Sequence, residues 1–222
     1  MTSTGALVAR ELVRSGHLVR SMRLAPYVTS VAAVAAYLVA RLGDTRDAVG
    51  DLRVLALLLA LGCGYALDDS AAATLQASPY GLARRLGLRI GCAAALVVPV
   101  WAAVLAIYLP SAPAADRWSL GLGLTTEPAA AVAVLWAVAA WARRQGFDEP
   151  GIITTPVLLA SLLLAASIPR LPMLVGPGRE WTPAHLRWSG IAVAATCALV
   201  AAMRDPAARL GSWGPIFRRT KS

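Results

Sequence analysis

The chain has 222 residues, of which 58% are hydrophobic and only 15% carry a charge. A soluble domain of this length needs more charge to cover its surface, so the composition indicates an integral membrane protein with one compact bundle. The net charge of +9 comes from short arginine clusters between apolar runs. Because these clusters form no continuous basic face, nucleic acid is excluded as an expected partner.

Residues 1–23 predict an amphipathic helix at the membrane surface. Arg10, Arg14 and His17 share one helical face, and apolar side chains share another. A basic helix beside a span lies in the membrane interface, with its arginines near anionic lipid headgroups. The alternative for this segment is a poorly ordered charged tail.

Six apolar segments follow within residues 24–203, and we expect each to cross the membrane as a helix. They cover about residues 24–42, 52–67, 90–109, 119–142, 150–168 and 186–203. The second is short, because its charge-free part, Val54–Leu67, reaches only about 21 Å against roughly 30 Å of hydrocarbon. Arg53 would then snorkel at one end, and the helix would continue past Leu67 into the cytosol. The expected fold class is an all-α, six-helix transmembrane bundle with a basic tail at 204–222.

The distribution of basic residues predicts the orientation of these spans. With both termini in the cytoplasm, fourteen of the 21 lysine and arginine residues lie inside and seven lie outside. This excess agrees with the positive-inside rule for membrane proteins. The alanine-rich composition indicates a bacterial protein, so we expect a multi-pass protein of the bacterial cytoplasmic membrane.

The sequence carries no motif for catalysis or for a metal. Its one lysine, Lys221, belongs to no P-loop, and it has no GxSxG or HExxH motif. The two histidines, His17 and His185, fall on opposite sides of the membrane in this topology, and the three cysteines lie singly in apolar runs. We therefore expect no enzyme activity, cofactor, metal or disulfide in this chain.

Glu127 is the one carboxylate placed well inside a predicted span, in the sequence Thr125-Thr126-Glu127-Pro128. One interpretation is structural: Thr126 or Glu127 caps a helix that has Pro128 in its first turn. The other is functional, because ionisable groups inside a membrane often line a translocation path.

The most informative segment is the polar loop 68–89 between the second and third spans. It begins with Asp68 and Asp69 and ends with three arginines, which are costly to place in hydrocarbon. We expect the loop to lie in water on the cytoplasmic side and to contact a soluble partner. The candidate contact residues are Asp68, Asp69, Thr74, Leu75, Ser78, Pro79, Leu82, Arg84 and Arg85.

With its interfacial helix, six spans and this loop, the chain resembles the permease subunits of ABC-2 type exporters. Those permeases carry a short coupling helix here, with acidic residues, Thr-Leu, Ser-Pro and then basic residues leading into the third span. The matching residues are Asp68, Asp69, Thr74, Leu75, Ser78, Pro79, Arg84, Arg85 and Arg89. The chain departs from the usual Glu-Arg and Gly-Thr of the family, with Asp68-Asp69 and Ala73-Thr74 in their place.

The resemblance implies a separate ATPase subunit bound to the loop, with ATP and Mg held by that partner, and a second copy of this or a similar permease. Leu75 and Leu82 would enter a groove on the ATPase, whose closure would move the second and third spans as rigid bodies. The apolar bundle suits an amphipathic or apolar substrate. Two alternatives remain open: a non-transporting membrane scaffold that recruits a cytoplasmic partner or anionic lipid, and a secondary transporter that uses Glu127.

Overall fold

The computed structural model describes residues 24–41, 47–68, 82–166 and 173–204. In this part of the chain all regular structure is helical, which confirms the all-α expectation. The elements are α2 (Ala25–Ala40), α3 (Ala48–Cys63), α5 (Leu82–Tyr108), the 3-10 turn η1 (Leu109–Ser111), α6 (Arg117–Arg144), α7 (Gly151–Ala166) and α8 (Trp181–Met203). The predicted helix at 1–23 and the basic tail at 205–222 lie outside the described residues.

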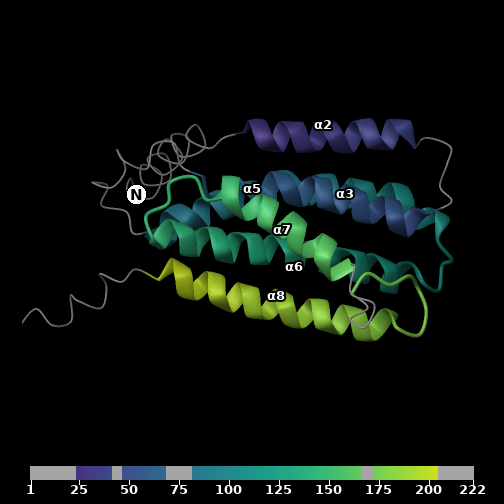
Figure 1. Ribbon diagram of the computed structural model, residues 1–222. Coiled ribbons are helices and arrows are strands. Elements are labelled where there is room, and N and C mark those ends of the chain that lie inside the picture. Colours follow the sequence, from purple (N-terminus) through teal and green to yellow (C-terminus); the bar gives the residue numbers. More distant parts are fainter. Residues whose placement is uncertain (1–23, 42–46, 69–81, 167–172, 205–222) are drawn as a thin grey trace, which may run out of the picture.

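The helices lie side by side along one axis and alternate in direction along the chain (Figure 1). α2 forms one side of the bundle and packs against α3, while α8 forms the opposite side. α6 lies between them and contacts α3, α7 and, over the largest surface, α8. Consequently α6 connects the α2–α3 side of the bundle to α8.

Among the described residues, three helices are long and apolar enough to cross a membrane: Ala83–Ser111, Arg117–Arg144 and Trp181–Met203. On α6, the exposed indoles of Trp118 and Trp141 lie 23 residues apart, which is about 34 Å along the axis. Tryptophan favours the two membrane–water interfaces, and this spacing slightly exceeds the hydrocarbon thickness of about 30 Å. These lengths and compositions are consistent with a membrane protein.

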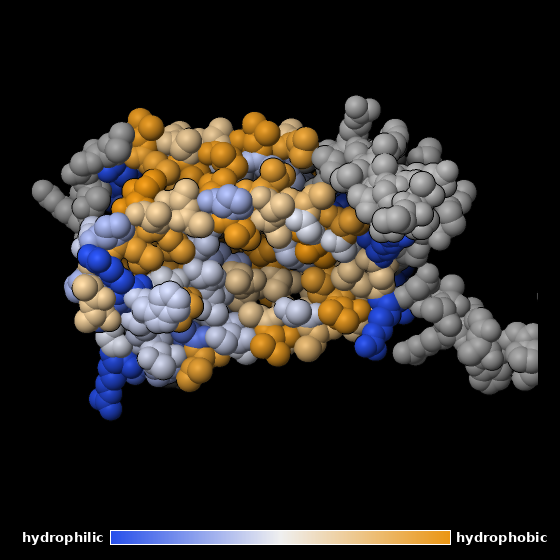
Figure 2. Space-filling model, turned by 180° about the vertical axis from the view of Figure 1, so that it is seen from behind, coloured by the Kyte–Doolittle hydropathy of each residue, from blue (hydrophilic) through white to orange (hydrophobic). Residues whose placement is uncertain are grey.

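The surface has the polarity that a membrane requires. In Figure 2 apolar side chains cover most of the middle of the face shown, and charged side chains gather at its two ends. Hydroxyl groups within the helices do not break this pattern, because Thr126, Ser161 and Thr196 each donate to a backbone carbonyl one turn back, at 2.6–2.8 Å. Such bonds satisfy polar groups where no water is available.

Two helix boundaries differ from the sequence prediction. α3 ends at Cys63 and does not continue past Leu67, because the chain turns at Gly64, where α7 passes so closely that a Cβ would lie 2.0 Å from Thr155 Oγ1. α5 begins at Leu82, so it includes the arginines that the prediction placed in the loop 68–89. Arginine is a good helix former, and the third helix therefore extends beyond its apolar part.

Small residues bring the helices close together in the interior. Ala93 on α5 and the three α6 residues Ala130, Ala139 and Ala140 are completely buried. Another close approach is at Gly123 on α6, where an added Cβ would lie 2.6 Å from Trp181 Cζ2. Close backbone approach at small side chains is the usual basis of helix packing in membranes.

We predict that Gly123→Ala lowers the free energy of unfolding by about 1–3 kcal/mol, because the new methyl group overlaps the buried side chains of Trp181 and His185. Gly91→Ala on α5 is the matched control, since nothing lies within 4 Å of its Cβ position. We expect the control to be neutral or slightly stabilising, because alanine favours helix by up to about 1 kcal/mol. Thermal unfolding of the purified protein in one detergent measures both, and equal midpoints would contradict the prediction.

Candidate functional site

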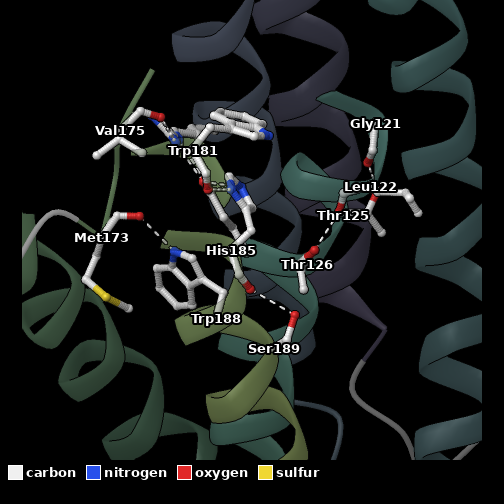
Figure 3. Close-up of polar contacts among 12 residues, drawn as sticks. Gly121, Leu122, Thr125, Thr126, Met173, Val175, Trp181, His185, Trp188 and Ser189 are labelled. Atoms are coloured by element: carbon white, nitrogen blue, oxygen red, sulfur yellow. Dashed lines mark hydrogen bonds and ion pairs between the residues drawn. The ribbon is translucent and has the colours of Figure 1, made fainter. Parts of the chain in front are cut away.

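Glu127 lies in the interior of α6 and does not cap a helix. α6 begins at Arg117, ten residues earlier, and Pro128 is inside the helix. The capping interpretation is therefore wrong, because the helix is already formed before it reaches this carboxylate. The Thr125 and Thr126 hydroxyls donate to the carbonyls of Gly121 and Leu122 at 2.7 and 2.6 Å (Figure 3).

The Glu127 carboxylate forms a two-point ion pair with Arg53 of α3. Arg53 Nε donates to Oε2 at 2.8 Å, and Nη2 donates to Oε1 at 2.6 Å. Arg53 Nη2 also donates to the carbonyl of Val175 at 2.7 Å. Glu127 is 6% exposed and Arg53 is 20% exposed, so the pair is largely removed from solvent. Planar two-point pairing is the geometry in which a buried arginine and a carboxylate best compensate for lost hydration.

His185 of α8 brings a third ionisable group to the same carboxylate. Its Nδ1 lies 2.7 Å from the carbonyl oxygen of Trp181, which can only accept, so the proton of a neutral ring is on Nδ1. Its Nε2 lies 3.2 Å from Glu127 Oε1, within ion-pair distance but outside hydrogen-bond geometry. Figure 3 shows the imidazole beside the Trp181 indole, and their ring centroids are 4.1 Å apart.

The tryptophan of the next turn extends the network to the chain before α8. Trp188 Nε1 donates to the carbonyl of Met173 at 2.8 Å, and its indole points toward that residue in Figure 3. Arg53 holds the carbonyl of Val175, two residues further on. The segment that precedes α8 is thus fixed by hydrogen bonds from both α3 and α8.

We call Arg53, Glu127 and His185 the charge cluster. Along α6, Glu127 is about 14 Å from Trp118 and about 21 Å from Trp141, so the charge cluster lies in the part of α6 between its two interfacial tryptophans. Charged side chains at such depth are rare and commonly functional. The sequence prediction identified Glu127 but expected Arg53 to snorkel and assigned His185 no role. Charge balance could have identified the pair. A carboxylate inside one predicted span needs a cation nearby, and Arg53 is an arginine at the edge of another predicted span.

The bundle has a hollow beside the charge cluster and a larger one nearby. One, of about 190 Å³, is lined by both Arg53 and Glu127, and its other walls are apolar. The larger, of about 470 Å³, lies between α3, α5, α6 and α8 and has an almost wholly apolar wall. Its lining includes Leu59, Val97, Trp101, Val132, Trp136 and Leu199. We refer to the first as the Arg53 groove and to the second as the central cavity.

At the end of the bundle where α7 begins, Asp68 is not in water as the sequence predicted. Its side chain is completely buried, and its Oδ1 accepts a hydrogen bond from the backbone N–H of Gly151 at 2.7 Å. Gly151 is the first residue of α7, so the carboxylate caps that helix and interacts favourably with its dipole. Arg89 of α5, itself 2% exposed, donates through Nη1 to the carbonyl of Asp68. A buried carboxylate has no surface to offer a docked protein, so we leave Asp68 out of the proposed contact set.

The other predicted contact residues fall into two groups. Asp69, Thr74, Leu75, Ser78 and Pro79 lie outside the described residues. Leu82, Arg84 and Arg85 belong to the first turn of α5, where Arg84 is exposed and Arg85 is half-buried. The contact surface proposed from the sequence therefore includes the beginning of a transmembrane helix as well as a loop.

No family model, curated protein or solved structure matches this chain, so its function is inferred from its own residues and their geometry.

We predict that Arg53→Gln destabilises the protein by about 3 kcal/mol, because it leaves the Glu127 carboxylate buried without its main partner. The double variant Arg53→Gln/Glu127→Gln should recover most of this loss, since two amides replace two charges. Thermal unfolding of wild type, both single variants and the double variant in one detergent gives the coupling between the residues. Additive losses would show that the ion pair contributes nothing to stability.

Proposed function

We propose that this chain is the permease subunit of an ATP-binding-cassette exporter. It would move an amphipathic or apolar substrate across the bacterial cytoplasmic membrane, driven by a separate ATPase docked on the 68–89 segment. The observation that carries the proposal is the relation between that segment and the central cavity. The segment joins α3 to α5, and both helices line the cavity. A partner that moves the segment would therefore move two walls of the cavity.

The central cavity suits the proposed substrate. Its volume of about 470 Å³ falls within the usual range of small-molecule sites, roughly 300–1,000 Å³. The hydroxyls of Thr125 and Thr196 are among its lining groups, and both donate to carbonyls of their own helices at 2.7 Å. A wall with so few available donors favours hydrocarbon over a polar solute.

The proposal includes six membrane crossings with both termini in the cytoplasm. Besides the three long helices, α2, α3 and α7 have 16 residues each and would span about 24 Å. Helices this short cross a bilayer by thinning it locally or by extending flanking side chains to the interface. Because the helices alternate in direction, the end of α3, the start of α5 and the α6–α7 turn fall at the same end of the bundle, as the proposed topology requires.

The proposed partners follow from this assignment. ATP and Mg would be bound by the ATPase and not by this chain. A second copy of this permease, or a similar permease, would complete the transporter, and membrane lipid would surround the apolar faces. A scaffold that transports nothing remains the alternative, and it predicts purification without an ATPase.

We predict that Leu75→Asp/Leu82→Asp leaves the protein folded but abolishes its copurification with the ATPase, since the two apolar side chains would no longer enter a groove on that partner. Phe147→Asp is the matched control, because Phe147 is an exposed apolar residue in the α6–α7 turn at the same end of the bundle. Mild-detergent purification from the native host, followed by mass spectrometry, measures the partner. An unchanged ATPase yield in the double variant would refute the docking assignment.

A second candidate is a secondary transporter driven by protons, which the position of His185 favours. Glu127 and His185 place two titratable groups 3.2 Å apart within a transmembrane bundle, beside the permanent charge of Arg53. Proton-driven transporters use such groups near the middle of the membrane.

For this candidate we expect transport in proteoliposomes to depend strongly on pH and to lose that dependence in Glu127→Gln. Thr126→Val is the control, because it changes the adjacent half-buried residue, whose hydroxyl bonds to Leu122, and leaves the charge cluster intact. Transport that requires the ATPase and has the same pH profile in Glu127→Gln would exclude the proton-driven mechanism.

A further inference from the structure

The guanidinium of Arg53 has donors that the protein does not use. Its Nε and Nη2 donate to Glu127 and to the carbonyl of Val175. Within the described part of the chain, Nη1 has no hydrogen-bond acceptor, although arginine carries two N–H groups on this nitrogen. The charge cluster therefore has more donors than acceptors, and the missing group is an acceptor.

These donors belong to a residue that lines an apolar groove. The remaining walls of the Arg53 groove are mainly aliphatic side chains of α3, α6 and α7 together with an indole of α8. Examples are Leu57, Leu159, Leu162 and Trp188. Arg53 is 20% exposed and its Nη1 is not a buried atom, so an acceptor from outside the bundle can reach it.

The charge arrangement decides the sign of the ligand. Both oxygens of Glu127 are already engaged, Oε2 by Arg53 Nε, and Oε1 by Arg53 Nη2 with His185 Nε2 close by. An incoming amine would have to approach these oxygens beside the positive charge of Arg53. An anionic group, in contrast, would meet a guanidinium with unused donors.

We propose that the Arg53 groove binds the anionic headgroup of a membrane amphiphile. Headgroup oxygens accept hydrogen bonds from Arg53 Nη1, and the first part of an acyl chain lies along Leu57, Leu159 and Trp188. The groove, of about 190 Å³, holds only part of such a molecule, and the rest of the chain stays in the lipid. The role of this molecule as the transported substrate rests on the proposed function, but its binding does not require the ATPase.

The test uses the full chain in detergent without any ATPase. Native mass spectrometry compares binding of phosphatidylglycerol with that of phosphatidylcholine carrying the same acyl chains. We expect wild type to prefer the anionic lipid by about tenfold, the change expected for one charge-assisted hydrogen bond. Inorganic phosphate in excess should not remove this preference, because it lacks the acyl chain.

Two kinds of variant locate the binding. Arg53→Gln/Glu127→Gln removes the donors without leaving a buried charge unpaired, and Leu159→Trp fills the groove without touching the charge cluster. Both should abolish the preference for phosphatidylglycerol. Ile153→Trp is the control on the same helix, because Ile153 is exposed and does not line the groove, and it should retain the preference.

The outcomes separate this inference from the proposed function. A preference that persists in both groove variants overturns the site, since the lipid then binds elsewhere on the surface. A preference that inorganic phosphate removes overturns the amphiphile and leaves a simple anion site. ATPase-driven transport without any lipid preference overturns only this inference, while groove-dependent lipid preference in a chain that never binds an ATPase overturns only the proposed function.

Discussion

The ion pair between Arg53 and Glu127 constrains the rest of this bundle. An isolated charge is costly inside a membrane, so α3 and α6 must meet at the height where these two side chains reach each other. The same carboxylate lies beside His185, which aligns α8, and the same guanidinium holds the chain before α8 through Val175. The Arg53–Glu127 ion pair thereby fixes the relative positions of three helices and one connecting segment.

The polar groups of the bundle lie at two depths and are used in different ways. Near the middle of α6, the charge cluster lies beside the Arg53 groove and keeps part of its donor capacity unused. At the end of the bundle where α7 begins, the Asp68 carboxylate is buried against the first residue of α7, and Arg89 holds the Asp68 carbonyl. The central cavity has apolar walls made by four helices. A binding function at the charge cluster and a mechanical connection at Asp68 are compatible with this division.

The sequence predicted the helices better than the contacts between them. Apolar runs and charged flanks located all six described helices, because length and composition are local properties. The position of Asp68 could not be predicted, since capping α7 depends on a residue 83 positions away. Glu127 was singled out as the carboxylate inside a predicted span, but its partner Arg53 lies 74 residues earlier, at the edge of a span where a flexible side chain commonly reaches water. The capping interpretation failed because α6 begins ten residues before Glu127, and a proline within a long helix was read as the start of one.

The separation of the paired charges has a consequence for biogenesis. At a synthesis rate of about 5–20 residues per second, Arg53 leaves the ribosome roughly 4–15 s before Glu127. In the proposed six-span topology, α3 would enter the bilayer during that interval with an arginine that has no counter-ion, at a cost of about 3 kcal/mol if it were at the centre of the membrane. Arg53 lies only five residues from the first residue of α3, so its long side chain would reach the interface in the meantime. The insertion of α6 would then draw the guanidinium inward, which would make the formation of this ion pair a late step of assembly.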